Sequence, residues 1–306
     1  MSISTRYAFD QASQQMSELQ TRIAKTQNQL ATGMQISKPS DDPEKVVAIQ
    51  RLQSAIVRQD SYTSTLATVG DRLAAEEGSV RGASEVMSRV KELAVQAANG
   101  TLGPADRANI AAELDSLKAD LLAFAGSRDI DGNYLFAGTR SSQQPFAAGP
   151  AGGTEYRGDQ SRINVSIGEQ RLIAVNRPGS QVFSSVARNN GAGAVGVGFF
   201  QVLDDLTTAV RASDQPGMQR SLDEVDQLQT GLSHALAQIG ADQNTISSQK
   251  IRIDETKLRL QTTLSTLSDS DYTEAITRLQ KETLSLQAAQ SSFAKTSSLS
   301  LFNYLK

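Results

Sequence analysis

The sequence has no cysteine and no tryptophan, and only one histidine in 306 residues. The lack of cysteine excludes disulfides and thiolate chemistry. One histidine, His234, cannot support a catalytic triad or a histidine-based metal site, and its place in the heptad pattern described below puts it on the solvent side. Serine is abundant, but no GxSxG nucleophile motif occurs. We therefore expect no enzyme, and assign no catalytic residue, no metal ligand and no cofactor.

Long apolar runs and strong net charge are also missing. No run approaches the roughly 20 apolar residues that a membrane helix needs. The formal net charge of −3 is too small to indicate attraction to nucleic acid or to a membrane surface. The start, MSISTRYAFDQASQQ, has no apolar segment followed by a cleavage site, so no Sec signal is expected. The protein is thus expected to stay in the cytoplasm or to leave by a route without such a signal.

A seven-residue apolar period is the strongest positive feature of the sequence. It begins near the N-terminus with Phe9, Met16, Ile23 and Leu30, and stops at Gly33. A second helix is predicted from Pro43, with Asp42 as its cap, to about residues 99–100. Spacing of this kind is typical of a coiled-coil seam. The apolar seam positions of this helix are Leu52, Leu66, Leu73, Val80 and Met87, with a polar break at Gln59. A second row, three residues on, has its polar break at Glu76.

The same period returns in the second half of the chain. A helix is predicted from about 216 to 268, close in length to the helix that starts at residue 43, so antiparallel pairing is expected. The seam positions of this helix that we single out are Leu232, Ile239, Ile246, Ile253, Leu260 and Leu267. After a phase slip, Asp271 and Glu274 resemble a capping box. The final helix then carries Tyr272, Leu279, Leu286 and Phe293.

Between these helices the composition changes. A short helix is predicted from about 104 to Gly126. Thirteen of the 22 glycines lie in residues 126–198. Strands are predicted at 133–138 and within 162–176, joined by glycine-rich turns. This segment is predicted to form a small, surface-exposed β domain.

Two stretches resemble ligand-binding motifs, and neither is convincing. GAGAVGVG (191–198) contains GxGxxG, but no strand is predicted before it, so we interpret it as a flexible linker. DIDGN (129–133) resembles the start of a calcium loop. Its glycine comes two positions early and Arg140 stands where the closing glutamate belongs, so we interpret it as a turn.

The fold class is therefore mainly α: a long antiparallel helical bundle or coiled coil built from both chain ends, with a small inserted β domain. We predict three parts. Residues 1–40 and 270–306 form a terminal coiled coil, residues 41–137 and 201–269 a long helical bundle, and residues 138–200 the β domain.

The terminal helices carry too little apolar surface to stand alone. Eight main-row side chains give on the order of 15 kcal/mol when buried, against on the order of 70 kcal/mol of backbone entropy for about 70 residues, only partly offset by hydrogen bonding. We expect these segments to order when copies assemble. The residues expected to make the subunit contacts are Phe9, Met16, Ile23, Leu30, Tyr272, Leu279, Leu286, Phe293, Leu299, Leu301, Phe302, Tyr304 and Leu305.

Several long stretches resemble the flagellin-like axial proteins of bacterial flagella. They are IAKTQNQLATGMQISKPSDDP (23–43) and AVQAANGTLGPADRANIAAELDSL (94–117). Within that family, DGNYLFAGTRSSQQPF (131–146) and the C-terminal stretch 268–306, ending in SLFNYLK, are similar to the members that join the hook to the filament. The β insert, residues 139–200, resembles the family in its general character and not in its sequence.

The resemblance implies a structural role. The termini would form the inner tube as paired helices, the long helices the outer tube, and the β domain would face outward. The implied partners are other copies of the chain, the other junction protein (FlgK type), flagellin, and an export chaperone (FlgN type) on the C-terminal helix. Export would use the flagellar type III apparatus. The alternatives are a flagellin itself, or a cytoplasmic coiled-coil adaptor.

Overall fold

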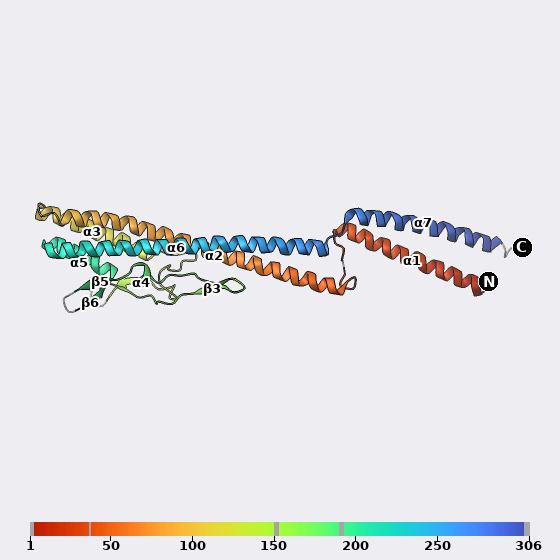
Figure 1. Ribbon diagram of the computed structural model, residues 1–306, viewed down its shortest axis with the longest axis horizontal. Coiled ribbons are helices and arrows are strands. Elements are labelled where there is room, and N and C mark those ends of the chain that lie inside the picture. The colour runs from red at the N-terminus through yellow and green to blue at the C-terminus, as the bar shows by residue number, and fades with distance from the viewer. Residues whose placement is uncertain (1–2, 37, 150–152, 190–192, 303–306) are drawn as a thin grey trace. The chain divides into compact units, whose positions relative to one another are not determined.

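The structure is a computed structural model that describes residues 3–36, 38–149, 153–189 and 193–302 (Figure 1). The helices of the described residues are α1 (Ile3–Thr32), α2 (Pro43–Ala97), α3 (Pro104–Ala125), α4 (Gly179–Val182), α5 (Phe199–Ala212), α6 (Gln215–Ser268) and α7 (Tyr272–Phe302). The strands are β1 (Phe146–Ala148), β2 (Thr154–Tyr156), β3 (Asn164–Gly168), β4 (Arg171–Ala174), β5 (Val186–Asn189) and β6 (Ala194–Val197). No helix in these ranges is both long and apolar enough to cross a membrane.

The chain forms two compact units. The first comprises Met1–Gln59 and Glu255–Lys306, and the second comprises Asp60–Asp254. Each long helix, α2 and α6, contributes to both units. The sequence suggested a terminal part that ends near residue 40 and resumes near 270, whereas the first unit extends further along both long helices. The division into three parts stays a prediction.

Local side-chain chemistry starts the helices where the sequence indicated. The Asp42 carboxylate accepts the Lys45 N–H at 3.1 Å, which caps α2. Asp271 accepts the N–H groups of Thr273 and Glu274 and so caps α7. In a capping box the Glu274 carboxylate would accept the Asp271 N–H in return. Here that carboxylate pairs instead with Arg278, one turn further along α7.

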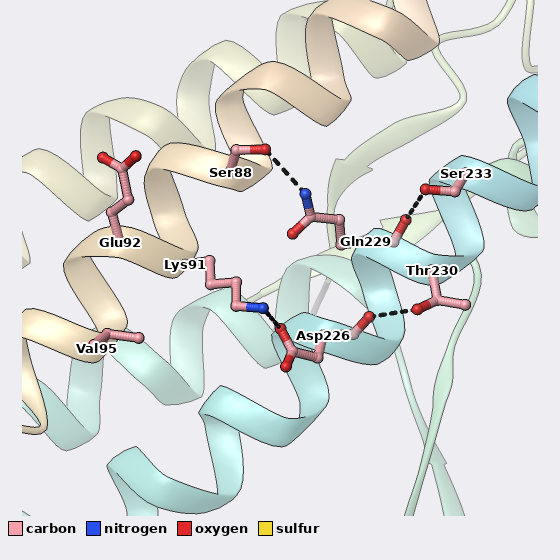
Figure 2. Close-up of a pocket in the computed structure, with 8 residues that line it drawn as sticks. All are labelled: Ser88, Lys91, Glu92, Val95, Asp226, Gln229, Thr230 and Ser233. Atoms are coloured by element: carbon pink, nitrogen blue, oxygen red, sulfur yellow. Dashed lines mark hydrogen bonds and ion pairs between the residues drawn. The ribbon is translucent and has the colours of Figure 1, made fainter.

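Within the second unit, α2 and α6 run antiparallel. The Ser88 hydroxyl lies 2.9 Å from the Gln229 amide nitrogen, and the Lys91 ammonium lies 2.6 Å from Asp226 (Figure 2). Further along, Gln243 donates to Glu77 at 2.8 Å. Residue numbers rise on α2 as they fall on α6, so the pair is antiparallel as predicted. These cross-links border an open polar groove on the pair, also lined by Glu92 and Val95.

The apolar seam of this pair is the core of the second unit. The buried seam residues are Leu66, Leu73, Val80, Met87, Leu232, Ile239, Ile246 and Ile253. The outlying seam residues Leu52, Leu260 and Leu267, which belong to the first unit, are only half-buried. Burial is therefore complete where other elements cover the pair.

Two shorter helices provide part of that cover. α3 and α5 pack against each other, with the ion pairs Lys118–Asp204 and Arg211–Asp115 between them. α3 also packs on α2, where a Cβ added to Gly82 would lie 2.5 Å from ring carbons of Phe124. Glycine at this point of α2 allows the two helices to approach closely.

The glycine-rich insert forms three separate antiparallel hairpins, β1–β2, β3–β4 and β5–β6, and these do not join into one sheet. Six aromatic rings hold it together and join it to α5, with neighbouring ring centroids 5.1–6.0 Å apart. These are Phe136, Phe146, Tyr156, Phe183, Phe199 and Phe200. Rings, rather than a continuous sheet, give the insert its core.

Two predictions in this region are wrong. Residues 133–138 form turns with one isolated bridge, Arg128 to Tyr134, instead of a strand. The side chains of Leu135 and Phe136 in this segment are part of the hydrophobic core, although the backbone there forms turns. Residues 194–197 form β6, paired with β5, instead of a flexible linker. Gly191, the first glycine of the GxGxxG match, lies outside the described residues.

An arginine from the insert reaches both long helices of the second unit. Arg177, which follows β4, is 5% exposed, and its Nη1 lies 2.9 Å from Oε2 of Glu76 on α2. Its Nη2 pairs with Asp242 on α6. Glu76, one of the two polar breaks in the predicted seam, is fully buried. Glu76, which interrupts the apolar row, is therefore paired with Arg177, and the spacing of the sequence could not reveal this pairing.

We predict opposite effects for alanine at two glycines of α2. Gly82→Ala should lower the free energy of unfolding by about 1–3 kcal/mol, because the new methyl group overlaps Phe124. Gly78→Ala should raise it by about 0.5–1 kcal/mol, because a Cβ at Gly78 meets nothing within 4 Å and alanine favours helix. Urea unfolding followed by circular dichroism measures both. Equal effects of the two changes would contradict this packing of α2 on α3.

We also predict that Glu76 makes stability depend on pH. Burial raises the pKa of Glu76 from its ordinary 4.5 to about 7, against the opposing pull of Arg177 and Arg72. The native state therefore holds a proton in a range where the unfolded chain has lost it. The contribution of this group to the free energy of unfolding is full below pH 4.5 and is lost as pH rises through 7, a change of ~3 kcal/mol.

Glu76→Gln is the control for this prediction, because glutamine does not titrate. The unfolding free energy of wild type minus that of Glu76→Gln should fall by ~3 kcal/mol between pH 4.5 and pH 8. Urea titrations at half-unit pH steps would measure it. Two parallel pH profiles would contradict the raised pKa.

Candidate subunit-assembly surface

The two terminal helices, α1 and α7, pair antiparallel within the first unit (Figure 1). The rings of Phe9 and Phe293 meet with centroids 4.4 Å apart. Nearer the other end of the pair, the Thr26 hydroxyl donates to the Glu282 carboxylate at 3.0 Å. The structure thus brings together seam residues from opposite ends of the chain.

A tight corner closes one end of this pair. Gly33 has φ +71, a conformation that favours glycine, and a Cβ there would also lie 2.9 Å from the Tyr272 hydroxyl. The Ser270 N–H donates to the Gly33 carbonyl at 2.9 Å, and the Gln35 N–H donates to the Ser268 carbonyl at 2.7 Å. These bonds form a short antiparallel bridge between the segment after α1 and the segment before α7.

The predicted contact residues of the termini are poorly covered. Phe9 is 49% exposed and Tyr272 is 54% exposed. The remaining main-row residues are half-buried: Met16, Ile23, Leu30, Leu279, Leu286 and Phe293. Within residues 9–36 and 268–295 the fully buried side chains are Thr26, Gln29 and Ala275. The pair therefore has a small and partly polar core.

The rest of the predicted surface is described only in part. α7 includes Leu299, Leu301 and Phe302, for which the structure describes the backbone alone. Tyr304 and Leu305 lie outside the described residues. The contact role of these five residues stays a prediction.

The heptad row did not identify every apolar residue that the terminal pair exposes. Tyr7 on α1 is 71% exposed, and Ile276 and Leu284 on α7 are 46% and 66% exposed. They lie off the main row, so a search for one seam misses them. They add to the apolar surface that the pair leaves open.

The structure describes His234 and the DIDGN turn, two features of the sequence that were weighed for other chemistry. His234 lies exposed on α6, as predicted. In the DIDGN turn, Asp129 accepts the N–H groups of Asp131 and Asn133, and its second oxygen pairs with Arg72 at 2.9 Å. The described residues contain no group of three or more acidic or histidine side chains placed to hold a metal.

Comparison with known proteins agrees with this architecture. Residues 3–141 match the bacterial flagellin N-terminal helical region, and residues 222–305 match the bacterial flagellin C-terminal helical region. The chain is 25% identical to flagellar hook-associated protein 3 of Escherichia coli K12 over 100% of both chains. It is 24% identical to the protein of the same name from Salmonella typhimurium LT2 over 99% of both chains.

A solved structure has the same fold. The crystal structure of Xanthomonas campestris FlgL is 22% identical, with a TM-score of 0.61 over 71% of this chain and 99% of that chain. Together the two flagellin regions span more than two thirds of the sequence, one at each end, and the hook-associated relatives align along its whole length. The chain belongs to the flagellin family of flagellar axial proteins, and it is similar over its full length to the hook-associated proteins of that family.

Proposed function

We propose that this protein is a structural component of the bacterial flagellum, forming the layer that joins the hook, through a second junction protein, to the flagellin filament. The observation that carries the proposal is the terminal pair: α1 and α7 form one antiparallel pair in which no described main-row residue is fully buried. The full-length likeness to hook-associated proteins supports the same role.

The physical reason lies in the geometry of two helices. A two-helix pair covers each apolar strip from one side only, so Phe9, Tyr272 and Leu284 keep about half or more of their surface open. Further helices are needed to complete that core. In an assembly of identical chains the nearest further helices are the termini of neighbouring copies. A head-to-tail contact of this kind generates a helical array instead of a closed dimer.

The finer parts of the proposal concern partners and route. The neighbours in the array are other copies of this chain, with a junction protein of the FlgK type on one side and flagellin on the other. Before assembly, the C-terminal helix is the binding site for a chaperone of the FlgN type. The protein works outside the cell and reaches its place through the flagellar type III apparatus.

We predict that a charge in the seam of α7 abolishes swimming. Leu286→Asp or Phe293→Asp places a carboxylate among apolar side chains that neighbouring copies must cover, and a buried unpaired charge is strongly unfavourable. The variant protein should still be made, and should be found in the culture medium instead of on the cell. Soft-agar motility and immunoblots of cells and medium measure this.

Ser285→Asp is the matched control, because it adds the same charge one residue away at an exposed position of α7. Swimming of the Ser285→Asp strain should equal that of wild type. Normal swimming of the Leu286→Asp and Phe293→Asp strains would contradict the assembly role of this seam. Retention of the wild-type protein inside the cell would instead favour a cytoplasmic coiled-coil adaptor.

A separate prediction distinguishes a junction layer from a filament subunit. A flagellin builds long filaments from purified protein, whereas a junction protein has to stop after a thin layer. We expect the purified chain, examined by negative-stain electron microscopy at raised ammonium sulfate, to form no long filaments. Long regular filaments would favour the flagellin alternative.

A further inference from the structure

A charged cluster interrupts the apolar seam of α2 in the second unit. Tyr62, Val69, Ala83 and Val90 belong to one heptad row, and Glu76 occupies the middle position of that row. Its carboxylate is fully buried. A charged group at such a position requires a specific partner.

Glu76 pairs with two arginines, which in turn bind groups in other parts of the unit. Arg177, after β4, reaches Glu76 with Nη1 and Asp242 on α6 with Nη2. Arg72, one turn before Glu76 on α2, places Nε 3.6 Å from Glu76 Oε1. The other end of the Arg72 guanidinium binds Asp129 and the Leu135 carbonyl, at 2.9 and 3.0 Å. The cluster therefore links α2, α6, the turn after α3 and the segment after β4.

This arrangement is a poor source of stability. Removing charges from water costs several kcal/mol each, and apolar side chains of similar volume are often at least as stabilising. One oxygen of Glu76 and Nε of Arg72 have no hydrogen bond of normal length. What the cluster does supply is geometry. A planar guanidinium satisfies two carboxylates on two helices in only one relative placement of the three elements.

A second arginine of the insert makes a comparable contact. Arg188 on β5 binds both oxygens of Glu224 on α6, at 2.6 and 2.7 Å, and also Asp205 on α5 at 2.6 Å. The β3–β4 and β5–β6 parts of the insert are thus each tied to two helices by one arginine. The β3–β4 hairpin also has contacts that carry no charge: Ile167 and Ile173 are buried, and the Gln249 side chain on α6 donates to the Ile167 carbonyl at 3.0 Å.

We propose that Arg177 is a positioning residue: by bridging Glu76 and Asp242 it fixes the orientation of the β3–β4 hairpin on the α2–α6 pair, and the local register of that pair. The aromatic core and the helical seam provide the stability of the unit. Arg177 selects one placement among several that the apolar contacts alone would permit. This inference does not depend on the proposed place of the protein in the flagellum.

Spin-label distances test the proposal directly, because the chain has no cysteine and labelling sites can be introduced freely. Gln170→Cys at the tip of the β3–β4 hairpin and Gln238→Cys on α6 are both at exposed positions. Pulsed electron spin resonance at pH 8 gives the distribution of the distance between the two labels. We expect one narrow distribution in the otherwise wild-type chain.

The decisive variant is Glu76→Met with Arg177→Met, which removes both buried charges together. Asp242 keeps enough exposure to be hydrated. We expect the Tm to stay within about 3 °C of wild type, while the label distribution becomes at least twice as wide or splits in two. Arg177→Met alone leaves Glu76 without its main partner, and should lower the Tm by about 10 °C if that chain folds.

Two controls restrict the interpretation. Arg162→Met removes an exposed arginine of the same insert, whose partner is Gln181, and should leave the distribution narrow. A label at Ala187→Cys on β5, paired with Gln238→Cys, should stay narrow in the double variant, because Arg188 still holds that hairpin.

Two results would overturn the proposal. An unchanged distribution between the labels at 170 and 238 in the double variant would mean that the uncharged contacts of the hairpin, the buried Ile167 and Ile173 and the Gln249 hydrogen bond, orient it without Arg177. A double variant as unstable as the Arg177→Met single variant would mean that the cluster supports the fold instead of selecting its geometry.

Discussion

The heptad seam of the two long helices is the constraint on which the rest of this protein depends. α2 has 55 residues and α6 has 54, so a strip of apolar side chains on each can follow the other for most of its length. Two helices cannot enclose such a strip by themselves. Where α3, α5 and the insert lie against the pair, Leu73 and Leu232 are fully buried, and where that cover ends, Leu52 and Leu260 are half-buried.

The same limitation explains the terminal pair. α1 and α7 repeat the seven-residue pattern, but the described part of the chain contributes no third helix to cover them. Their seam is therefore half-exposed, and the fully buried positions of the described pair lie off the main row and are threonine, glutamine and alanine. A chain of this family that works as a structural part of the flagellum gains from that incompleteness, because apolar surface left open in one copy is available to the next.

The insert follows a different principle. Its short hairpins are too small to form a sheet with its own core, and the aromatic rings of Phe146, Phe183 and Phe200 supply one. Rings of the insert also pack on Phe199 and Phe200 of α5, and two arginines add ionic contacts: Arg177 and Arg188 each bridge two helices. Apolar contacts make the association favourable, while the paired charges restrict it to one geometry.

Sequence by itself determined the long helices α1, α2, α6 and α7, since the seven-residue period and the caps Asp42 and Asp271 are local signals. The predicted starts at 43, 216 and 272 lie within one residue of the observed ones. Tertiary structure alone decided which seam positions are buried, because burial depends on what packs from outside. It also decided that residues 133–138 are turns and that the seam break at Glu76 is paired with Arg177, 101 residues away. No local pattern carries that pairing, since the two side chains are brought together only by the folding of the insert onto the long helices.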